Sequence, residues 1–167
     1  MCGACGRLFV AAVMIGLLAV IRAFAAGGET EVLGVAGDLV PDSICVGPDG
    51  KRFAAVVVDP VTNKRQVIEN CRNLGKEYDL VAQGTPIFSP DGGRIAFVAA
   101  RGGKCFVVVD GIEGTGYEIV QDRWPIADLV LSRSGQHIAY KTRKNARNYL
   151  VVDGQEFGPY DLSLIHI

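Results

Sequence analysis

The chain has 167 residues, which is enough for one domain with a hydrophobic core. Its formal net charge is −1, which excludes a strongly basic protein that its overall charge would draw to nucleic acid or to anionic membranes. Glycine accounts for 21 residues, and many of them lie in short turn motifs at regular spacing. This composition favours an all-β chain with many hairpins over a helical one.

The N-terminal block is typical of an export signal. Leu8–Ile21 is an uninterrupted apolar run of roughly 14 residues, short of the ~20 that span a bilayer as a helix. Arg7 precedes the run, and Ala23–Ala25 supplies the small-x-small pattern that a signal peptidase requires. We therefore predict a cleaved signal helix over residues 1–25 and a periplasmic or extracellular protein without a stable membrane span. An uncleaved anchor is the alternative.

A repeat runs through the rest of the chain. Ser89–Glu118 aligns without a gap on Ser132–Asp161, so that, for example, Val108–Gly111 meets the identical Val151–Gly154. An earlier copy is more diverged, and in it Pro48–Arg52 aligns with Pro90–Arg94. The domain of residues 26–161 is therefore predicted to contain three repeat units, at about 40–81, 82–122 and 123–161. A period of this length fits the four-stranded blade of a β-propeller.

The second unit can be divided into strands. Thr85–Phe88 is the expected first, innermost strand, and Arg94–Ala100 and Lys104–Asp110 are the second and third. A fourth strand begins at Tyr117. The second and third strands are continuous apolar runs rather than alternating ones, which is typical of strands covered on both faces.

The motif Ser89–Phe97 (Ser-Pro-Asp-Gly-x-x-Ile-Ala-Phe) resembles the WD-repeat-like blades of TolB-type periplasmic β-propellers. The following Val107–Gly111 is similar to a repeat of exported bacterial proteins. The resemblance covers roughly residues 40–161, although Gly47 replaces the serine in the first unit and Arg133–Ser134 replaces Pro-Asp in the third. It implies an all-β, partial β-propeller of about three four-stranded antiparallel blades, with periplasmic partners such as envelope lipoproteins.

The last six residues, Leu162–Ile167, resemble the translation of a transposon-end adapter used in sequencing libraries. We interpret 162–167 as an artificial tail on a truncated reading frame; a genuine tail is the alternative. A truncated propeller is expected to expose the apolar face of its last blade and to be poorly soluble or oligomeric.

No residue pattern points to catalysis or to a metal. The sequence has no Gly-x-Ser-x-Gly motif, and His137 is the only histidine before the interpreted tail. Asp49 and Asp91 lie in Pro-Asp-Gly turns, and Trp124 is interpreted as a packing aromatic between units. Among Cys45, Cys71 and Cys105 at least one cannot pair within the mature chain. We expect no cofactor, metal site or catalytic residue.

Charge recurs with the repeat. The turns between second and third strands are basic, and the turns at the other end carry acidic residues that include Glu113 and Glu156. We predict that a basic end binds an envelope protein or an anionic polymer; simple solvation of charged turns is the alternative. The predicted partner-binding residues are Lys64, Arg65, Arg101, Lys104, Arg143, Lys144 and Arg147.

The sequence therefore predicts an exported, non-enzymatic propeller that binds a protein or polymer in the cell envelope and does not bind nucleic acid. The alternative is the propeller domain of a hydrolase or peptidase whose catalytic part is not in this chain.

Overall fold

The computed structural model describes residues 9–15, 18–24, 30–121 and 123–160, and the side chains from residue 37 onward. The elements of these residues are β-strands, and no helix occurs among them. The predicted all-β class is therefore confirmed. The predicted tail, 162–167, lies outside the described residues.

The N-terminal segment contains strands where a signal helix was expected. β1 (Phe9–Ile15), β2 (Leu18–Phe24) and β3 (Thr30–Ala36) form an antiparallel sheet in chain order. The predicted signal helix is thus not confirmed. Apolar runs rich in valine, isoleucine and phenylalanine suit a covered strand as well as a helix, and hydrophobic periodicity does not separate the two.

Three further antiparallel sheets follow, which we call sheets I, II and III. Sheet I contains β4 (Asp38–Leu39), β5 (Cys45–Val46), β6 (Phe53–Val58), β7 (Arg65–Glu69) and β8 (Arg72–Tyr78). Sheet II contains β9 (Leu80–Val81), β10 (Ile87–Phe88), β11 (Ile95–Arg101), β12 (Lys104–Val109), β13 (Ile112–Glu113) and β14 (Tyr117–Glu118). Sheet III contains β15 (Ile126–Leu131), β16 (Ile138–Lys144), β17 (Arg147–Val152) and β18 (Gln155–Tyr160).

Each of these sheets is a four-stranded meander. In sheet I, β4 and β5 both pair with β6, so together they form one interrupted first strand; β9 and β10 do the same against β11. In sheet II the fourth strand is also interrupted, because β13 and β14 both pair with β12. Sheet III has four continuous strands in the order β15-β16-β17-β18.

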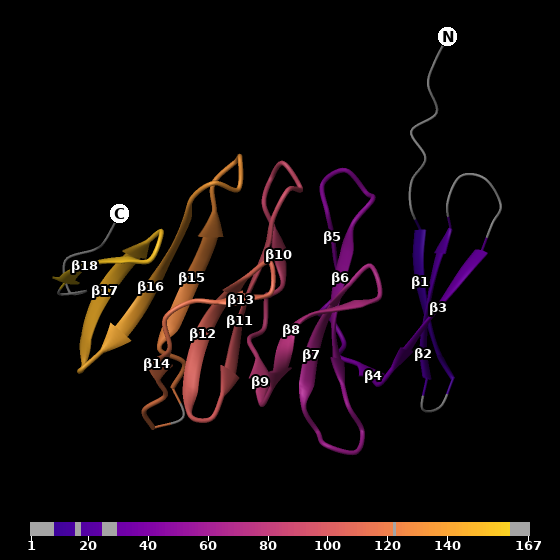
Figure 1. The fold of residues 1–167 in the computed structure, drawn as a ribbon, viewed down its shortest axis with the longest axis horizontal. Helices are drawn as coiled ribbons and strands as arrows, with labels where there is room; N and C mark the ends of the chain where they lie inside the picture. Colours follow the sequence, from indigo (N-terminus) through magenta and orange to yellow (C-terminus); the bar gives the residue numbers. More distant parts are fainter. Residues whose placement is uncertain (1–8, 16–17, 25–29, 122, 161–167) are drawn as a thin grey trace, which may run out of the picture.

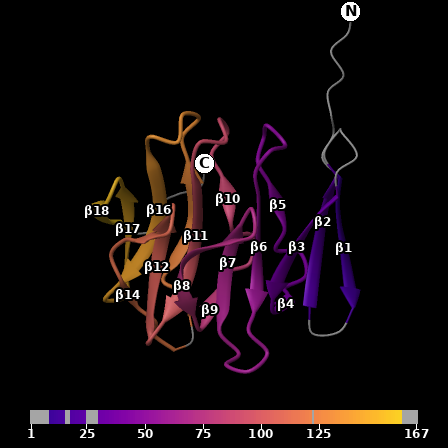
Figure 2. The same cartoon turned by 45° about the vertical axis from the view of Figure 1, so that its right-hand side comes forward.

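The sheets lie side by side in chain order (Figures 1 and 2). The hairpins β6–β7, β11–β12 and β16–β17 are all at the lower end of Figure 1, and the β5–β6, β10–β11 and β15–β16 turns are all at the upper end. Equivalent loops of the repeat therefore gather at the same end of the molecule.

The repeated serine and aspartate residues build the turns at the upper end. The Ser89 hydroxyl is buried, donates to Asp91 at 2.5 Å and accepts the amide of Arg94 at 2.9 Å. Gly92 closes this turn with a φ of 75°. Asp110, in the next turn at the same end, accepts the amide of Ile95 at 3.0 Å. These acidic residues therefore have a structural role in the turns.

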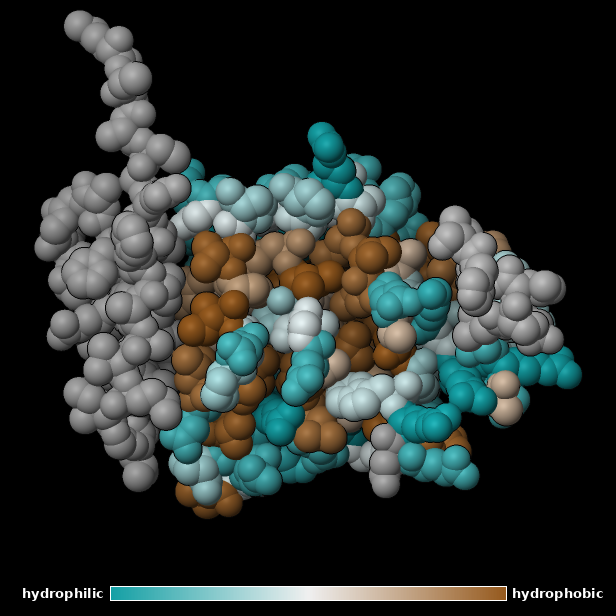
Figure 3. All heavy atoms as spheres, turned by 180° about the vertical axis from the view of Figure 1, so that it is seen from behind, coloured by the Kyte–Doolittle hydropathy of each residue, from teal (hydrophilic) through white to brown (hydrophobic). Residues whose placement is uncertain are grey.

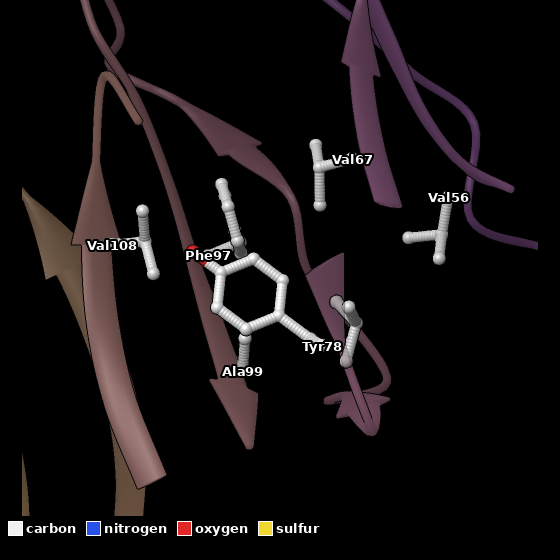
Figure 4. Packing of buried hydrophobic residues seen from close by; sticks show 7 residues of the cluster. Val56, Val67, Tyr78, Phe97, Ala99 and Val108 are labelled. Carbon is white, nitrogen blue, oxygen red and sulfur yellow. The ribbon is translucent and has the colours of Figure 1, made fainter. Parts of the chain in front are cut away.

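The core lies between the sheets. Phe97 and Ala99 of β11 pack toward sheet I, whereas Val98 between them belongs to the cluster shared with sheet III. This explains why β11 is a continuous apolar run, since both of its faces are covered. Figure 4 shows the cluster between sheets I and II, in which the Tyr78 and Phe97 rings meet edge to face at 5.7 Å.

The same four kinds of side chain meet at both interfaces, and we call this set the clasp: a tyrosine, a second aromatic residue, a glutamate and a basic residue. Between sheets II and III, Tyr117 meets Tyr140 edge to face and donates a hydrogen bond to Glu156 at 3.1 Å, while Lys144 lies 3.3 Å from the same carboxylate. Between sheets I and II, the aligned residues are Tyr78, Phe97, Glu113 and Arg101.

The clasp between sheets I and II lacks the hydrogen bond between tyrosine and glutamate that the clasp between sheets II and III contains. Arg101 binds the Glu113 carboxylate at 2.9 Å and lies over the Tyr78 ring at 6.0 Å. The Tyr78 hydroxyl and Glu113 Oε1 are buried, and neither has a hydrogen-bond partner among the described residues. Burial, and then the neighbouring Tyr140 and Glu156, raise the pKa of Tyr117, and burial likewise raises the pKa of Tyr78. Both phenols are therefore held in the protonated form.

A pair of equivalent glycines provides a direct test of the stacking. Gly111 and Gly154 have the same φ of 82°, but a Cβ on Gly111 would lie 3.1 Å from the backbone nitrogen of Gly75 in sheet I, whereas a Cβ on Gly154 would meet nothing within 4 Å. We expect Gly154→Ala to lower the free energy of unfolding by about 1 kcal/mol and Gly111→Ala by about 2 to 3 kcal/mol. Urea unfolding of the two variants measures the difference. Equal losses would contradict the close approach of sheets I and II.

Candidate binding surface

Four of the seven predicted partner-binding residues form ion pairs within the fold. Arg101 pairs with Glu113 and Lys144 with Glu156, and the other two pairs are Lys64 with Asp79 and Lys104 with Glu118. The predicted separation of charge between the two ends is therefore wrong for Glu113 and Glu156. These residues lie on the fourth strands β13 and β18 rather than in the turns, so long basic side chains of the same sheet reach them.

The other three predicted residues, Arg65, Arg143 and Arg147, form no ion pair with any described residue. Arg65 is half-buried on β7, whereas Arg143 and Arg147 are exposed at the β16–β17 hairpin. Arg123, in the connection between sheets II and III, is a third exposed arginine that makes no ion pair in the described part of the chain. Lys51 and Arg72 of sheet I and Arg133 of sheet III are likewise exposed and form no ion pair with a described residue, so unneutralised positive charge is not confined to one sheet; three such arginines, Arg123, Arg143 and Arg147, lie at the β16–β17 hairpin and in the connection that precedes sheet III.

An exposed aromatic side chain lies among these arginines. Trp124 is 36% exposed, so its interpretation as a packing aromatic between units is not confirmed. Together with Pro125 and Arg143 it lines two cavities, of about 490 Å³ and 370 Å³. Asn145 and Arg123 line the smaller one. We call the residues Arg123, Trp124, Arg143 and Arg147 the rim surface.

The larger cavity opens on the face of sheet III that is turned away from sheet II. This outer face carries Leu150, Phe157 and Tyr160, each between 39% and 46% exposed, together with an ion pair of 2.7 Å between Lys141 and Asp128. The expectation of an apolar face is thus corrected to a mixed one. The physical reason is that Lys141 occupies the repeat position that Val98 holds in sheet II.

The tyrosines at equivalent positions of the repeat, Tyr78, Tyr117 and Tyr160, also differ in how far they are buried. Tyr78 and Tyr117 are buried between sheets, whereas Tyr160 lines the larger cavity with 46% of its surface exposed. Sequence alignment of the repeat marks Tyr160 as equivalent to Tyr117, but only the structure shows that its environment differs. Tyr160 and Trp124 are therefore the surface residues that the sequence interpretation missed.

Apolar surface also gathers on the side of the molecule seen in Figure 3, between hydrophilic residues at the upper and lower edges. Several exposed apolar side chains lie on or beside the first strands of the sheets: Ile44, Val46, Leu80 and Val130.

Few side chains that could support metal binding or catalysis lie together in the part of the chain that the structure describes. No group of three or more His, Cys, Asp or Glu side chains there could hold a metal ion. None of the described segments forms a helix long and apolar enough to cross a membrane. Cys105 is buried, which raises its pKa to about 12, and its thiol is therefore a packing group at neutral pH.

Comparison with known proteins supports the fold. The β-propeller domain of the Trilobed protease from Pyrococcus furiosus has a TM-score of 0.53 and 12% identity, over 93% of this chain and 58% of that one. Two TolB structures are also similar: the putative TolB from Agrobacterium tumefaciens (TM-score 0.45, 18% identity, 87% and 61% covered) and TolB from Acinetobacter baumannii (TM-score 0.40, 17% identity, 92% and 41% covered). No protein-family profile matches the chain, and no curated protein does.

The class of protein follows from these findings and from the stacked sheets. The fold is that of a β-propeller, and sheets I, II and III fit its four-stranded antiparallel blades. The predicted propeller resemblance is thus confirmed, with TolB proteins among the similar structures. The chain spans about three fifths of the length of the first two solved structures that it matches.

Proposed function

We propose that the chain is an exported, non-enzymatic propeller module of the cell envelope, and that its rim surface binds an acidic protein or an anionic polymer. One observation carries the proposal. The basic side chains Lys64, Arg101 and Lys104 at one end of sheets I and II are paired with carboxylates, whereas the three arginines of the rim surface are exposed and unpaired among the described residues. Two of them, Arg123 and Arg143, line a cavity with the exposed Trp124.

The chemistry of these residues suits an acidic partner. A guanidinium group is weakly hydrated and presents its donors in a planar fork that matches a carboxylate or a phosphate. Tryptophan and arginine are also the residues that most often dominate the affinity of protein interfaces. Export is proposed from the apolar run Leu8–Ile21 and the small residues that follow it.

Charge reversal at the rim surface tests the proposal. We expect fluorescein-labelled poly-L-glutamate to bind the protein at low salt, and the double variant Arg143→Glu/Arg147→Glu to bind it at least tenfold more weakly, because attraction becomes repulsion. Fluorescence anisotropy measures the affinity. The same charge change at the opposite end, in Lys51→Glu/Arg133→Glu, is the matched control, since both residues are exposed and unpaired among the described residues. Equal weakening in both double variants, or none in either, would contradict a localised site.

The likeness to a protease's propeller domain supports a second candidate, in which the chain is the propeller domain of a hydrolase or peptidase. The complete gene separates the two candidates. A Gly-x-Ser-x-Gly motif in a further domain, with peptidase activity in the gene product, favours the second candidate.

A further inference from the structure

We propose that the cavity of about 370 Å³ on the rim surface, which we call the rim cavity, binds an acidic polysaccharide: one sugar ring lies against the Trp124 indole, and Arg123 and Arg143 hold the anionic group of the sugar. This inference rests on the proposed function and names the ligand as an anionic carbohydrate chain rather than an acidic protein.

The rim cavity lies between two loops at the lower end of the molecule (Figure 1). The connection from β14 to β15 supplies Gln121, Arg123 and Trp124, and the β16–β17 hairpin supplies Arg143 and Asn145. The site is therefore built by sheets II and III and the connection between them, and it needs no residue from a further sheet.

The corresponding junction between sheets I and II is closed by its own polar contacts. Asp79 alone connects β8 to β9 there, and its carboxylate accepts the amide of Gly102 at 2.9 Å and pairs with Lys64. Between sheets II and III the connection comprises residues 119–125 and includes the exposed Trp124. A loop that departs from its repeat and lines a cavity is a frequent location for a binding site.

The Trp124 side chain suits the flat face of a sugar ring. The face of an indole is electron-rich, whereas the C–H groups of a sugar carry partial positive charge, so the two surfaces attract each other as they bury apolar area. With 36% of its surface exposed, Trp124 can make this contact. Gln121 and Asn145 line the same cavity and are exposed, and their amide groups can donate to and accept from sugar hydroxyls.

The two arginines favour a sugar that carries negative charge. Arg123 and Arg143 both line the rim cavity, and neither forms an ion pair with a residue that the structure describes. Glu118, which also lines it, is paired with Lys104 at 3.5 Å. A guanidinium group binds a carboxylate through two parallel hydrogen bonds. A neutral sugar would leave both guanidinium groups without such a partner.

The size of the rim cavity also favours a sugar over a folded protein segment. Ligand pockets range over about 300 to 1,000 Å³, and 370 Å³ lies near the lower limit. An acidic peptide offers carboxylates, but an aspartate or glutamate side chain has no ring to lie on the indole. A chain of uronic acid rings supplies both groups in each unit.

The first test uses tetragalacturonate, a short chain of uronic acid rings, as the probe. Trp124 is the only tryptophan in the chain, so its fluorescence reports directly on the rim cavity. We expect tetragalacturonate to change the emission saturably at low salt, and its fully methyl-esterified form, which has the same rings without charge, to bind at least about tenfold more weakly. Unchanged emission, or equal binding of the acid and the ester, overturns the inference.

Variants of Trp124 test the ring contact by titration calorimetry. We expect Trp124→Ala to weaken tetragalacturonate binding by at least about tenfold, and Trp124→Tyr, which keeps an aromatic ring, by no more than about threefold. The matched control is Phe157→Ala, which removes an exposed aromatic ring that does not line the rim cavity and should change the affinity by no more than about twofold. Equal weakening by Trp124→Ala and Phe157→Ala would contradict the assigned contact.

Titration with poly-L-glutamate separates this inference from the proposed function. Poly-L-glutamate has no ring, so Trp124→Ala should change its affinity by no more than about twofold, whereas Arg143→Glu/Arg147→Glu should weaken both ligands. If Trp124→Ala weakens neither ligand while the double variant weakens poly-L-glutamate, the sugar site is overturned and the basic binding surface stands. Equal weakening of both ligands by Trp124→Ala overturns the choice of a carbohydrate. If the double variant weakens neither ligand, both proposals are overturned.

Discussion

Replacing Phe97 with alanine is expected to lower the free energy of unfolding by about 4 kcal/mol, the largest single effect in the chain. The ring is fully buried between sheets I and II and meets Tyr78 edge to face, so its removal leaves a cavity at the centre of the interface (Figure 4). A loss of this size approaches the whole stability of many domains. Urea unfolding monitored by circular dichroism measures it.

Phe157→Ala is the control for that prediction, because Phe157 is the same residue type on the outer face of sheet III and is 44% exposed. We expect it to lower the free energy of unfolding by no more than about 1 kcal/mol. Comparable losses in the two variants would mean that sheets I and II are not packed on each other in solution.

Glu113→Ala is expected to lower the free energy of unfolding by about 2 to 3 kcal/mol. The carboxylate is 13% exposed and binds Lys76 of sheet I at 3.0 Å and Arg101 of sheet II at 2.9 Å. Alanine at this position removes two charge-assisted hydrogen bonds from a carboxylate that is itself largely buried, while Lys76 and Arg101, which are 57% and 37% exposed, regain water in its place. Chemical denaturation in urea at neutral pH provides the measurement.

Glu118 provides the comparison, since it is paired with Lys104 at 3.5 Å but is 70% exposed. An exposed ion pair contributes little, so Glu118→Ala should change the free energy of unfolding by no more than about 0.5 kcal/mol. If Glu113→Ala is as mild as Glu118→Ala, the ion pair of Glu113 with Lys76 does not help to hold sheets I and II together.

The repeat made most of the propeller predictable, because the apolar runs and the turn residues recur together. The expected second strand, Arg94–Ala100, differs by one residue at each end from β11 (Ile95–Arg101). The expected first strand, Thr85–Phe88, contains β10 but not β9 (Leu80–Val81), which is the other half of the interrupted strand. β9 is two residues long and Pro86 lies between it and β10, so neither alternation nor an apolar run marked β9 in the sequence. Over β1 and β2 the apolar composition favoured a helix, which the structure does not confirm.

The candidate site was less predictable, because ion pairing depends on neighbours in space. The positions of the basic hairpins followed from the repeat, but Arg101 and Lys144 are neutralised by glutamates that lie 12 residues further along the chain, on another strand of the same sheet. The exposure of Trp124 and Tyr160 depends on which face of sheet III is covered, and a single repeat unit carries no such information.

The central claim is that consecutive sheets pack on each other through an edge-to-face pair of aromatic rings with a glutamate nearby, and that between sheets II and III this contact includes a hydrogen bond from Tyr117 to Glu156. A double-mutant cycle on Tyr117→Phe and Glu156→Gln measures that hydrogen bond most directly. We expect a coupling of about 1 to 2 kcal/mol in the free energy of unfolding, since the hydroxyl donates to this carboxylate at 3.1 Å. The same cycle with Tyr160→Phe should give no more than about 0.3 kcal/mol. Additive losses for Tyr117 and Glu156 would contradict the account.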